Sequence, residues 1–301
     1  MKSLLLRLLL GVFALGFVAT SGFAQTHSGA IKALKVSGAV TRVDKTGATS
    51  VVTDGIILTE SDTIITGDNS GVVLVFMNGS SVKLGAKSRL LVEQFKMDPL
   101  AGDINVATLK KEPSVSQTTL NLTYGELVGD VKKLNKSSTY NIKTAVGAAG
   151  IRGTIFRIVM TPSSDGKTYT FQLATAEGLV VFTGTLDNSP VDVPGGTQVD
   201  STADVDATGA IAPSGVTKGD IGVDVAFVIT GAVDEIIQQA QQAGSFTPTE
   251  QSVMIEAAGA QSISVNLTVE IPAPPTATVG GTGGTTVDKD GKPVVDGSPS
   301  N

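Results

Sequence analysis

The chain is acidic and lacks the residues that several kinds of site require. Its 301 residues are 41% hydrophobic and 17% charged, which suffices for one large domain or two modest domains with cores of their own. It has no cysteine and a single histidine, which excludes disulfides, thiol catalysis, Ser-His-Asp catalysis and multi-histidine metal sites. The net charge of −6 argues against a nucleic-acid-binding surface.

Residues 1–24 have the pattern of a secretory signal. Lys2 and Arg7 supply positive charge, residues 8–19 are apolar, and residues 22–24 place small side chains at the positions that signal peptidase recognises. The apolar run is shorter than the about 20 residues that a membrane-spanning helix needs. We therefore expect a periplasmic or secreted protein with no membrane span after cleavage, and an uncleaved membrane anchor is the alternative.

A β pattern runs through the first half of the chain and is clearest in one hairpin. Residues 72–77 are all apolar, which predicts a strand that is buried on both faces. The Asn-Gly pair at 78 and 79 follows, and it predicts a type I′ turn in which both central residues have positive φ. In the second arm Ser81 and Lys83 alternate with apolar residues, which predicts one wet face.

The stretch 141–158 predicts a strand, a compact corner and a second strand. Gly147, Gly150 and Gly153 interrupt its apolar run. Glycine permits positive φ and a close approach of two backbones, so we expect these three glycines to form one structural corner packed against other backbone.

The segments on either side are less regular. Residues 96–118 predict a surface excursion with a short helical piece at 104–111. Towards the C-terminus, residues 223–229 predict a strand and residues 232–243 predict the one convincing helix, because two acidic residues near its start suit the helix dipole and a glycine follows its end. Residues 262–271 predict an isolated strand.

Seven short motifs follow one another between residues 36 and 200. They are Gly38-Ala39-Val40, residues 64–68 (IITGD), Asn78-Gly79-Ser80, residues 124–127 (YGEL), residues 150–156 (GIRGTIF), residues 177–180 (EGLV) and Pro194-Gly195-Gly196. In this order they resemble the FecR domain family, and the Arg-Gly-Thr-x-Phe element at 152–156 is the most specific of them. The resemblance covers a little over half of the chain.

This resemblance implies an all-β, partly solenoid-like domain on the outer side of a bacterial inner membrane. The best-known members are sigma-factor regulators that pass a signal from a TonB-dependent outer-membrane receptor, through one membrane span, to a cytoplasmic anti-sigma segment. Here a predicted signal peptide stands where that segment and span would be, and Thr144-Ala145 replaces the usual threonine-proline. The β-domain therefore carries over, whereas the sigma-regulating role does not.

The predicted fold class is all-β: a FecR-like β-sandwich or short β-solenoid with one C-terminal helix and a disordered tail. The expected parts are a signal peptide at 1–24, the FecR-like β-domain at 31–205, a C-terminal α+β extension at 206–271 and a disordered tail at 272–301. The tail is rich in glycine, proline and threonine and cannot bury enough apolar surface to order itself.

The candidate binding residues are Arg152, Thr154 and Arg157, which flank the predicted corner. The arginines could bind a carboxylate, a sugar acid or the strand edge of a partner. The alternatives are that Arg152 bonds the carbonyls of its own corner, that Arg157 is a solvated strand residue and that Thr154 satisfies backbone groups at the bend.

Other polar groups suit structural roles. Asp54, Asp62 and Asp68 fall at turns; they could join a calcium site, but such residues more often cap their own turns, so no metal site is assigned. Lysines 132, 133 and 136 are expected on a solvated hairpin face.

No catalytic residue, cofactor or nucleic-acid partner is assigned, and the protein is not expected to be an enzyme. The expected function is that of an exported, non-catalytic binding or interaction module of the bacterial cell envelope, with an envelope protein or a glycan as partner. Two alternatives stay open: a structural or adhesive envelope protein, and a periplasmic sensor in TonB-linked iron or siderophore signalling.

Overall fold

The computed structural model describes residues 27–246 apart from residues 99, 101, 102, 187, 207, 209 and 210. All of these residues belong to the first of two units into which the chain divides, residues 1–260. The predicted signal peptide, the predicted strand at 262–271 and the predicted tail lie outside the described residues.

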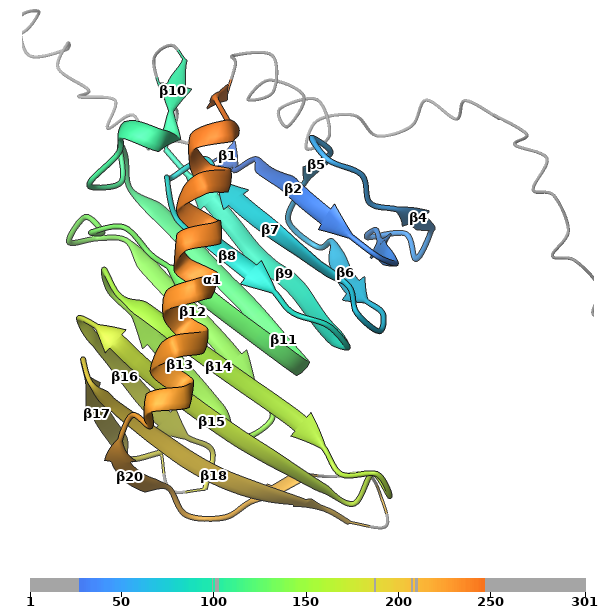
Figure 1. Ribbon diagram of the computed structural model, residues 1–301, viewed down its shortest axis with the longest axis vertical. Helices are drawn as coiled ribbons and strands as arrows, with labels where there is room; N and C mark the ends of the chain where they lie inside the picture. Colours follow the sequence, from blue (N-terminus) through green and yellow to red (C-terminus); the bar gives the residue numbers. More distant parts are fainter. Residues whose placement is uncertain are drawn as a thin grey trace, which may run out of the picture. The chain divides into compact units, whose positions relative to one another are not determined.

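The described residues form two large β-sheets (Figure 1). Sheet A contains, in spatial order, β4 (Thr49–Val51), β3 (Val40–Val43), β6 (Thr63–Thr66), β9 (Ser88–Met97), the first part of β11 (Ser116–Asp130), β12 (Thr139–Thr144), β13 (Gly147–Ile151), β16 (Leu179–Gly184) and β17 (Pro190–Pro194), with β1 (His27–Ser28) beside β9.

Sheet B contains β5 (Ile57–Leu58), β2 (Ile31–Ser37), β7 (Gly71–Phe76), β8 (Ser81–Leu84), the second part of β11, β14 (Ile155–Pro162), β15 (Thr168–Glu177) and β18 (Thr197–Val205), with β19 (Ile211–Pro213) and β20 (Thr217–Asp220) on the far edge of β18. The all-β prediction is thus confirmed. Strands β19 and β20 extend sheet B beyond residue 205, at which the predicted β-domain ends.

Aromatic side chains join the inner faces of the two sheets. Phe171 of sheet B stacks on Phe182 of sheet A with ring centroids 4.9 Å apart. Phe76 of sheet B meets the edge of Phe95 of sheet A at 5.0 Å and also contacts Tyr140 of β12. Full burial of such a side chain stabilises a fold by about 1.5–3 kcal/mol, so these contacts hold the sheets face to face.

Strand β11 belongs to both sheets. Its residues up to Tyr124 pair with β9 in sheet A, and those from Gly125 onward pair with β14 in sheet B. Gly125 has a φ of 104°, and a Cβ atom built there would lie 2.3 Å from Cβ of Ser88. Only glycine fits at this crossing point, because any side chain would have to occupy the space of β9.

Helix α1 (Val223–Gln242) lies on the outer face of sheet B, where it packs against β7, β8, β11, β14 and β15 (Figure 1). The prediction of a strand at 223–229 is wrong, and the predicted helix begins nine residues too late. Residues Val225, Ile229, Ala232 and Ile236 recur at helical spacing and pack against the core. Their burial on the sheet overrides the strand propensity of the β-branched residues in this segment.

The hairpin β7–β8 confirms one expectation and corrects two. Every residue of β7 is buried, as predicted. Asn78 does not have positive φ, so the turn is not of type I′. The amide of Phe76 donates to the carbonyl oxygen of Ser80, and among the three residues between them Gly79 is the one with positive φ, at 87°. This is a three-residue loop with the glycine in the left-handed region. Ser81 is buried, not wet, because α1 covers this face of β8.

The segment at 104–111 is less helical than predicted. Strand β10 (Ile104–Asn105) pairs with β21 (Ser245–Phe246), and only residues Val106–Thr108 form a helical turn, the 3-10 helix η1. Because three residues close no complete α-helical turn, this element is positioned by its neighbours, among them α1.

The predicted single glycine corner is two separate turns. Residues 145 and 146 connect β12 to β13, and residues 152–154 connect β13 to β14. Gly153 lies in the second turn with a φ of 70°, whereas Gly147 and Gly150 lie within strand β13. A Cβ atom on Gly147 would lie 2.5 Å from the carbonyl oxygen of Thr183, so this glycine permits close packing within the sheet and does not bend the chain.

Candidate functional site

A row of polar side chains crosses the outer face of sheet B. At its centre Arg157 of β14 donates from Nε to Oε1 of Glu126 at 2.5 Å and from Nη1 to Oε1 of Gln172 at 2.8 Å. Gln172 donates to Oδ1 of Asp200 at 3.0 Å, and Gln198 donates to Oδ2 of Asp200 at 2.9 Å. Side chains from β11, β14, β15 and β18 are therefore linked by hydrogen bonds.

Strand register produces this row. Val159 lies opposite Glu126 on β11 and opposite Gln172 on β15, while Arg157 lies two residues along β14 on the same face. The long guanidinium side chain can thus reach diagonally to both partners. The prediction that Arg157 is a candidate binding residue stays untested, but its charge is already balanced by Glu126.

The outer face is hollowed beside Arg157 by a depression of about 440 Å³. Hydroxyl groups dominate its rim, with Thr170, Thr202, Ser214 and Thr217 among the lining residues. Oγ1 of Thr202 and Oγ of Ser214 are 2.8 Å apart and bond each other. With one guanidinium and one carboxylate in its wall, this depression suits a polar ligand of low net charge.

An apolar groove lies between α1 and sheet B. Its volume is about 270 Å³, and Val128, Phe227 and Val228 line it together with the exposed edge of Gly85. Phe227 is 80% exposed, which is unusual for a large aromatic side chain. The groove borders the polar row because Glu126 lines it as well.

Ion pairs fasten α1 over this face. Glu235 contacts Nζ of Lys83 at 2.5 Å and Nζ of Lys35 at 3.3 Å. Burial raises the pKa of Glu235, but the hydrogen bonds and charges of the two lysines outweigh it, so the pKa of this carboxyl lies below its ordinary value. At the other end, Nζ of Lys32 donates to the carbonyl oxygen of Ala243, which closes the helix C-terminus.

The three predicted binding residues do not form one site. Arg152 is exposed, and its Nη2 donates to the carbonyl oxygens of Asn135 and Lys136, each at 3.2 Å. These carbonyls belong to a neighbouring loop and not to the corner of Arg152 itself. Thr154 is buried, and its carbonyl oxygen accepts from the amide of Val131 at 3.0 Å. Arg157 lines the depression on the outer face of sheet B.

Sequence reasoning missed Glu126, Gln172, Asp200 and Phe227 as members of this surface. Gln172 was identifiable as an outward residue from the alternation of its strand. Its partners come from strands far apart in the sequence, and their register is not encoded in local periodicity. Phe227 was assigned to a strand, so its exposure on a helix could not be foreseen.

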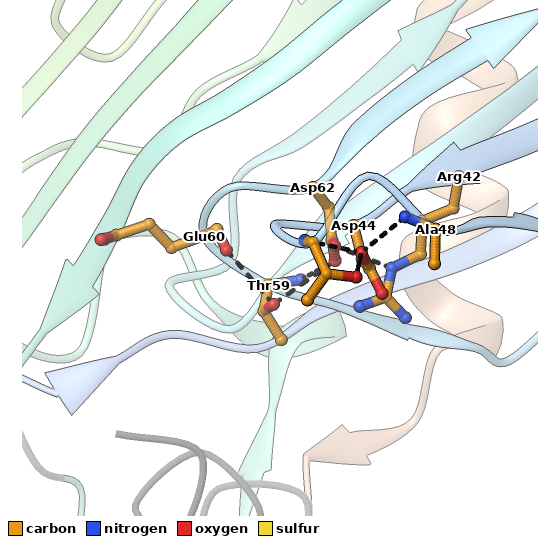
Figure 2. Close-up of polar contacts among 7 residues, drawn as sticks. Arg42, Asp44, Ala48, Thr59, Glu60 and Asp62 are labelled. Atoms are coloured by element: carbon orange, nitrogen blue, oxygen red, sulfur yellow. Dashed lines mark hydrogen bonds and ion pairs between the residues drawn. The ribbon is translucent and has the colours of Figure 1, made fainter. Parts of the chain in front are cut away.

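The carboxylates that were considered for calcium are engaged by the protein itself. Figure 2 shows Asp62 between Arg42, whose Nε donates to it at 2.7 Å, and Thr59, whose backbone amide donates to it at 2.7 Å. Nearby, Asp44 accepts bonds from the hydroxyl and amide of Thr46, which lower the pKa of its carboxyl. These oxygens are engaged in turn geometry of the kind that short carboxylates favour.

The other two carboxylates are also engaged, since Asp54 accepts from the amide of Val36 at 2.6 Å and Asp68 pairs with Lys87. Among the described residues, no group of three or more His, Cys, Asp or Glu side chains is arranged to hold a metal ion.

Chain reversals stack into a first column, which we call the glycine column. The amide of Lys132 bonds the hydroxyl of Ser80 at 3.3 Å, and a Cβ atom on Gly153 would lie 3.3 Å from Cα of Lys133. A Cβ atom on Gly178 would lie 2.6 Å from the carbonyl oxygen of Gly153. Each turn of the chain forms one level of this column. The turn at Gly195 forms the level after Gly178, because the amide of Gly195 donates to the carbonyl oxygen of Gly178 at 2.9 Å.

A second column joins further turns of the chain to the crossing point of β11. The amide of Gly67 donates to the carbonyl oxygen of Ala39, and the amide of Lys87 donates to that of Gly67. Gly85 donates to Glu126, whose own amide donates to the hydroxyl of Ser88 at 3.0 Å. Backbone groups in this column are therefore satisfied by the neighbouring segment of the chain.

A comparison with protein-family models identifies the central part of this fold. The model described as FecR protein matches residues 62–185. The chain carries a FecR domain. Of the short motifs that resemble this family, those at 78–80, 150–156 and 177–180 lie in the glycine column, and those at 64–68 and 124–127 lie in the second column. Most motifs of the FecR domain thus contribute residues to one of these two columns.

The solved structures that resemble this chain include two crystal structures, at 1.65 and 2.50 Å resolution, described as a "putative anti-sigma factor" from Parabacteroides distasonis ATCC 8503. Both are 11% identical to this chain and cover 55% of it, with TM-scores of 0.37 and 0.36. The chain spans 62% of the length of each of these structures. No curated protein matches the chain.

The FecR-domain protein has no helix, within its described residues, that is both long enough and apolar enough to cross a bilayer.

Proposed function

We propose that this FecR-domain protein is an exported, non-catalytic interaction module of the bacterial cell envelope. The FecR match supports an envelope role, and the predicted secretory signal at 1–24 supports export. The docking surface of the module is the apolar groove beside α1 together with the polar row centred on Arg157, and its partner is a protein.

The observation that carries this proposal is the exposure of Phe227. A phenylalanine that is 80% exposed beside an apolar groove can supply a large buried contact when a partner covers it. The adjacent row from Glu126 to Asp200 offers hydrogen-bonding groups at the rim of the same surface. An apolar centre with a polar rim is the usual anatomy of a protein–protein interface.

Export is tested first on the full chain with a C-terminal tag. Fractionation of a producing bacterium should place the tagged protein outside the cytoplasm, and mass spectrometry should find a mature N-terminus after Ala24. A cytoplasmic protein that keeps residues 1–24 would overturn the exported role.

Docking is then tested by cross-linking in intact cells, followed by identification of the cross-linked protein. The wild-type chain and a Val51→Ser variant should yield the same partner, because Val51 is 70% exposed on β4, outside the groove. Phe227→Ser should lose that partner while retaining its folded spectrum. Equal yields from all three chains would remove the groove as the docking surface, and cross-links solely between copies of this chain would favour a structural role.

A further inference from the structure

Unpaired cations gather at one stretch of the glycine column. They are Lys110, Lys111, Lys133, Lys136 and Arg152, and we call this set the cationic ridge. All of these residues are exposed, and within the described chain none has a carboxylate at ion-pair distance. Such a concentration of one sign is unexpected on a chain with a net charge of −6.

Backbone contacts fix the ridge residues beside one another. Lys111 and Lys133 face each other in a parallel β-bridge. Gly153 approaches Lys133 so closely that a Cβ atom on it would lie 3.3 Å from Cα of that lysine, and Arg152 bonds the carbonyl oxygen of Lys136. Since neighbouring strands are about 4.8 Å apart, the backbones of Lys111, Lys133 and Arg152 lie close together along the column.

The nearby carboxylates form no ion pair with the cations of the ridge. Glu112 is only 3% exposed, and its carboxylate accepts from the hydroxyl of Ser116 at 2.6 Å and from the amide of Asn135. Asp130 is paired with Lys132 at 2.7 Å. Loop 131–138 is therefore held by Glu112 from within and by Arg152 from outside, while the remaining ammonium groups face solvent.

The composition of the ridge indicates the class of ligand. No aromatic residue occurs in the segments 106–112, 131–138 and 150–154 that form it, so it has no platform on which nucleic-acid bases could stack. Nor does any of the large apolar side chains that are exposed in the described part lie in these segments, so it has nothing to insert into a lipid bilayer. What remains is a row of charges with long, flexible stems.

We propose that the cationic ridge binds a linear anionic polysaccharide of the cell envelope through its charge. A chain of sugar acids is itself linear, so it can lie along the ridge and bring successive carboxylates to successive cationic groups. The proposal rests on the proposed function in one respect, that export brings the ridge to such polymers. It is distinct from the docking groove, and purified protein tests it independently of export.

The test measures binding of the purified full chain to immobilised alginate, a polymer of uronic acids, with dextran as the uncharged reference. Binding to alginate is expected at low ionic strength and should weaken towards about 0.15 M salt, and dextran should not bind. Absence of salt-dependent binding to alginate would overturn the proposal.

A pair of matched variants locates the site. Lys111→Gln with Lys136→Gln removes two ridge charges and should weaken binding about two- to thirtyfold, as expected for exposed ion pairs. Lys45→Gln with Lys167→Gln removes two exposed charges from turns elsewhere on the described surface and should change the affinity less than about twofold. Equal losses from the two pairs would mean that net charge, and not the ridge, causes binding.

Reversal of one negative charge beside the ridge should increase the affinity for alginate. Glu177 is exposed at the next level of the column, between Ala176 and Gly178, where its negative charge ends the row. Glu177→Lys should therefore raise the affinity for alginate. Vesicles of phosphatidylglycerol and phosphatidylcholine and soluble polyglutamate complete the test, and a stronger interaction with either than with alginate would overturn the choice of a polysaccharide.

Discussion

Gly178 and Gly153 are in main-chain contact at two successive levels of the glycine column. A Cβ atom on Gly178 would lie 2.6 Å from the carbonyl oxygen of Gly153 and 2.7 Å from Cγ2 of Thr154. The chain therefore returns to this column with no side chain between its levels. The turns of this column are thus stacked as closely as neighbouring strands of a sheet.

The substitution Gly178→Ala should be strongly destabilising. Its φ of 83° disfavours any side chain, and the added methyl group would also collide with backbone of the level below. We expect the free energy of unfolding to fall by about 2–4 kcal/mol, as measured by urea denaturation of the full chain.

Gly196→Ala is the matched control. Gly196 has nearly the same φ, 84°, but a Cβ atom there would meet nothing within 4 Å. This variant should lose only the about 1–2 kcal/mol that left-handed backbone costs. Equal losses at both positions would mean that φ alone matters and that the stacking contact is not tight.

Removal of the charge on Asp62 should destabilise the N-terminal part of the sandwich. Asp62 is 1% exposed and joins Arg42 of β3 to the turn at Thr59. In Asp62→Asn the guanidinium would lose its counter-charge in a partly buried place, and the free energy of unfolding should fall by about 2–4 kcal/mol.

The control for this variant is Asp68→Asn. Asp68 and Lys87 also form an ion pair, but both side chains are more than 70% exposed. Water screens this pair, so its loss should change the free energy of unfolding by less than about 0.5 kcal/mol. A comparable effect from both variants would contradict a structural role of the buried pair.

Attachment of α1 should depend on pH through Glu235. Because the folded-state pKa of this carboxyl is lowered from its ordinary value of 4.5, the stabilisation is fully present above that value and is lost as the pH falls through the lower folded-state pKa. Urea denaturation of wild type and Glu235→Gln should therefore show a gap of about 1 kcal/mol at neutral pH that closes in acid. A gap that persists at pH values well below 4.5 would show that the charge of Glu235 is not its cause.

Asp234→Asn, which removes a neighbouring exposed carboxylate of the same helix, should have an effect below about 0.5 kcal/mol at neutral pH.

Removal of the hydroxyl of Tyr140 should not harm the fold. This side chain is 2% exposed, and its hydroxyl has no hydrogen-bond partner among the described residues. Burial also raises its pKa, since a phenolate there would be stripped of water. In urea denaturation, the free energy of unfolding of Tyr140→Phe should equal that of the wild type or exceed it by up to about 1 kcal/mol.

Ser88→Ala is the contrasting case. The Ser88 hydroxyl is also buried, but it accepts from the amide of Glu126 and donates to the carbonyl oxygen of Ala86. Its removal should cost about 1–2 kcal/mol because two backbone groups lose a partner. If Tyr140→Phe proved as costly as Ser88→Ala, the assignment of an unsatisfied phenol would be wrong.

Local patterns predicted the elements whose causes are local. The unbroken apolar run at 72–77 predicted a strand with no solvent-exposed face, because apolar and polar residues do not alternate in it. Every residue of β7 is indeed buried. The alternation of apolar and polar residues at 168–173 puts Phe171 and Gln172 on opposite faces of a strand, and in the structure Phe171 is buried while Gln172 is only partly buried. The seven short motifs, taken in their order along the chain, were sufficient to recognise the FecR domain.

Features that depend on tertiary contacts were not accessible in this way. Residues 223–229 carry strand-favouring side chains but pack as a helix on sheet B. Gly147 resembles a turn residue but relieves a contact with Thr183 on another strand. The partners of Arg157 were invisible for the same reason, since Glu126 is brought beside it only by the pairing of β11 with β14.

The crossing of β11 from one sheet to the other has a mechanical consequence. Pulling the two sheets apart would load the covalent backbone at Tyr124–Gly125, because that single strand is hydrogen-bonded on both sides of the interface. Neither layer can peel away while the other stays intact. We therefore expect the sandwich to resist shear as one body and to yield in a single abrupt event under force.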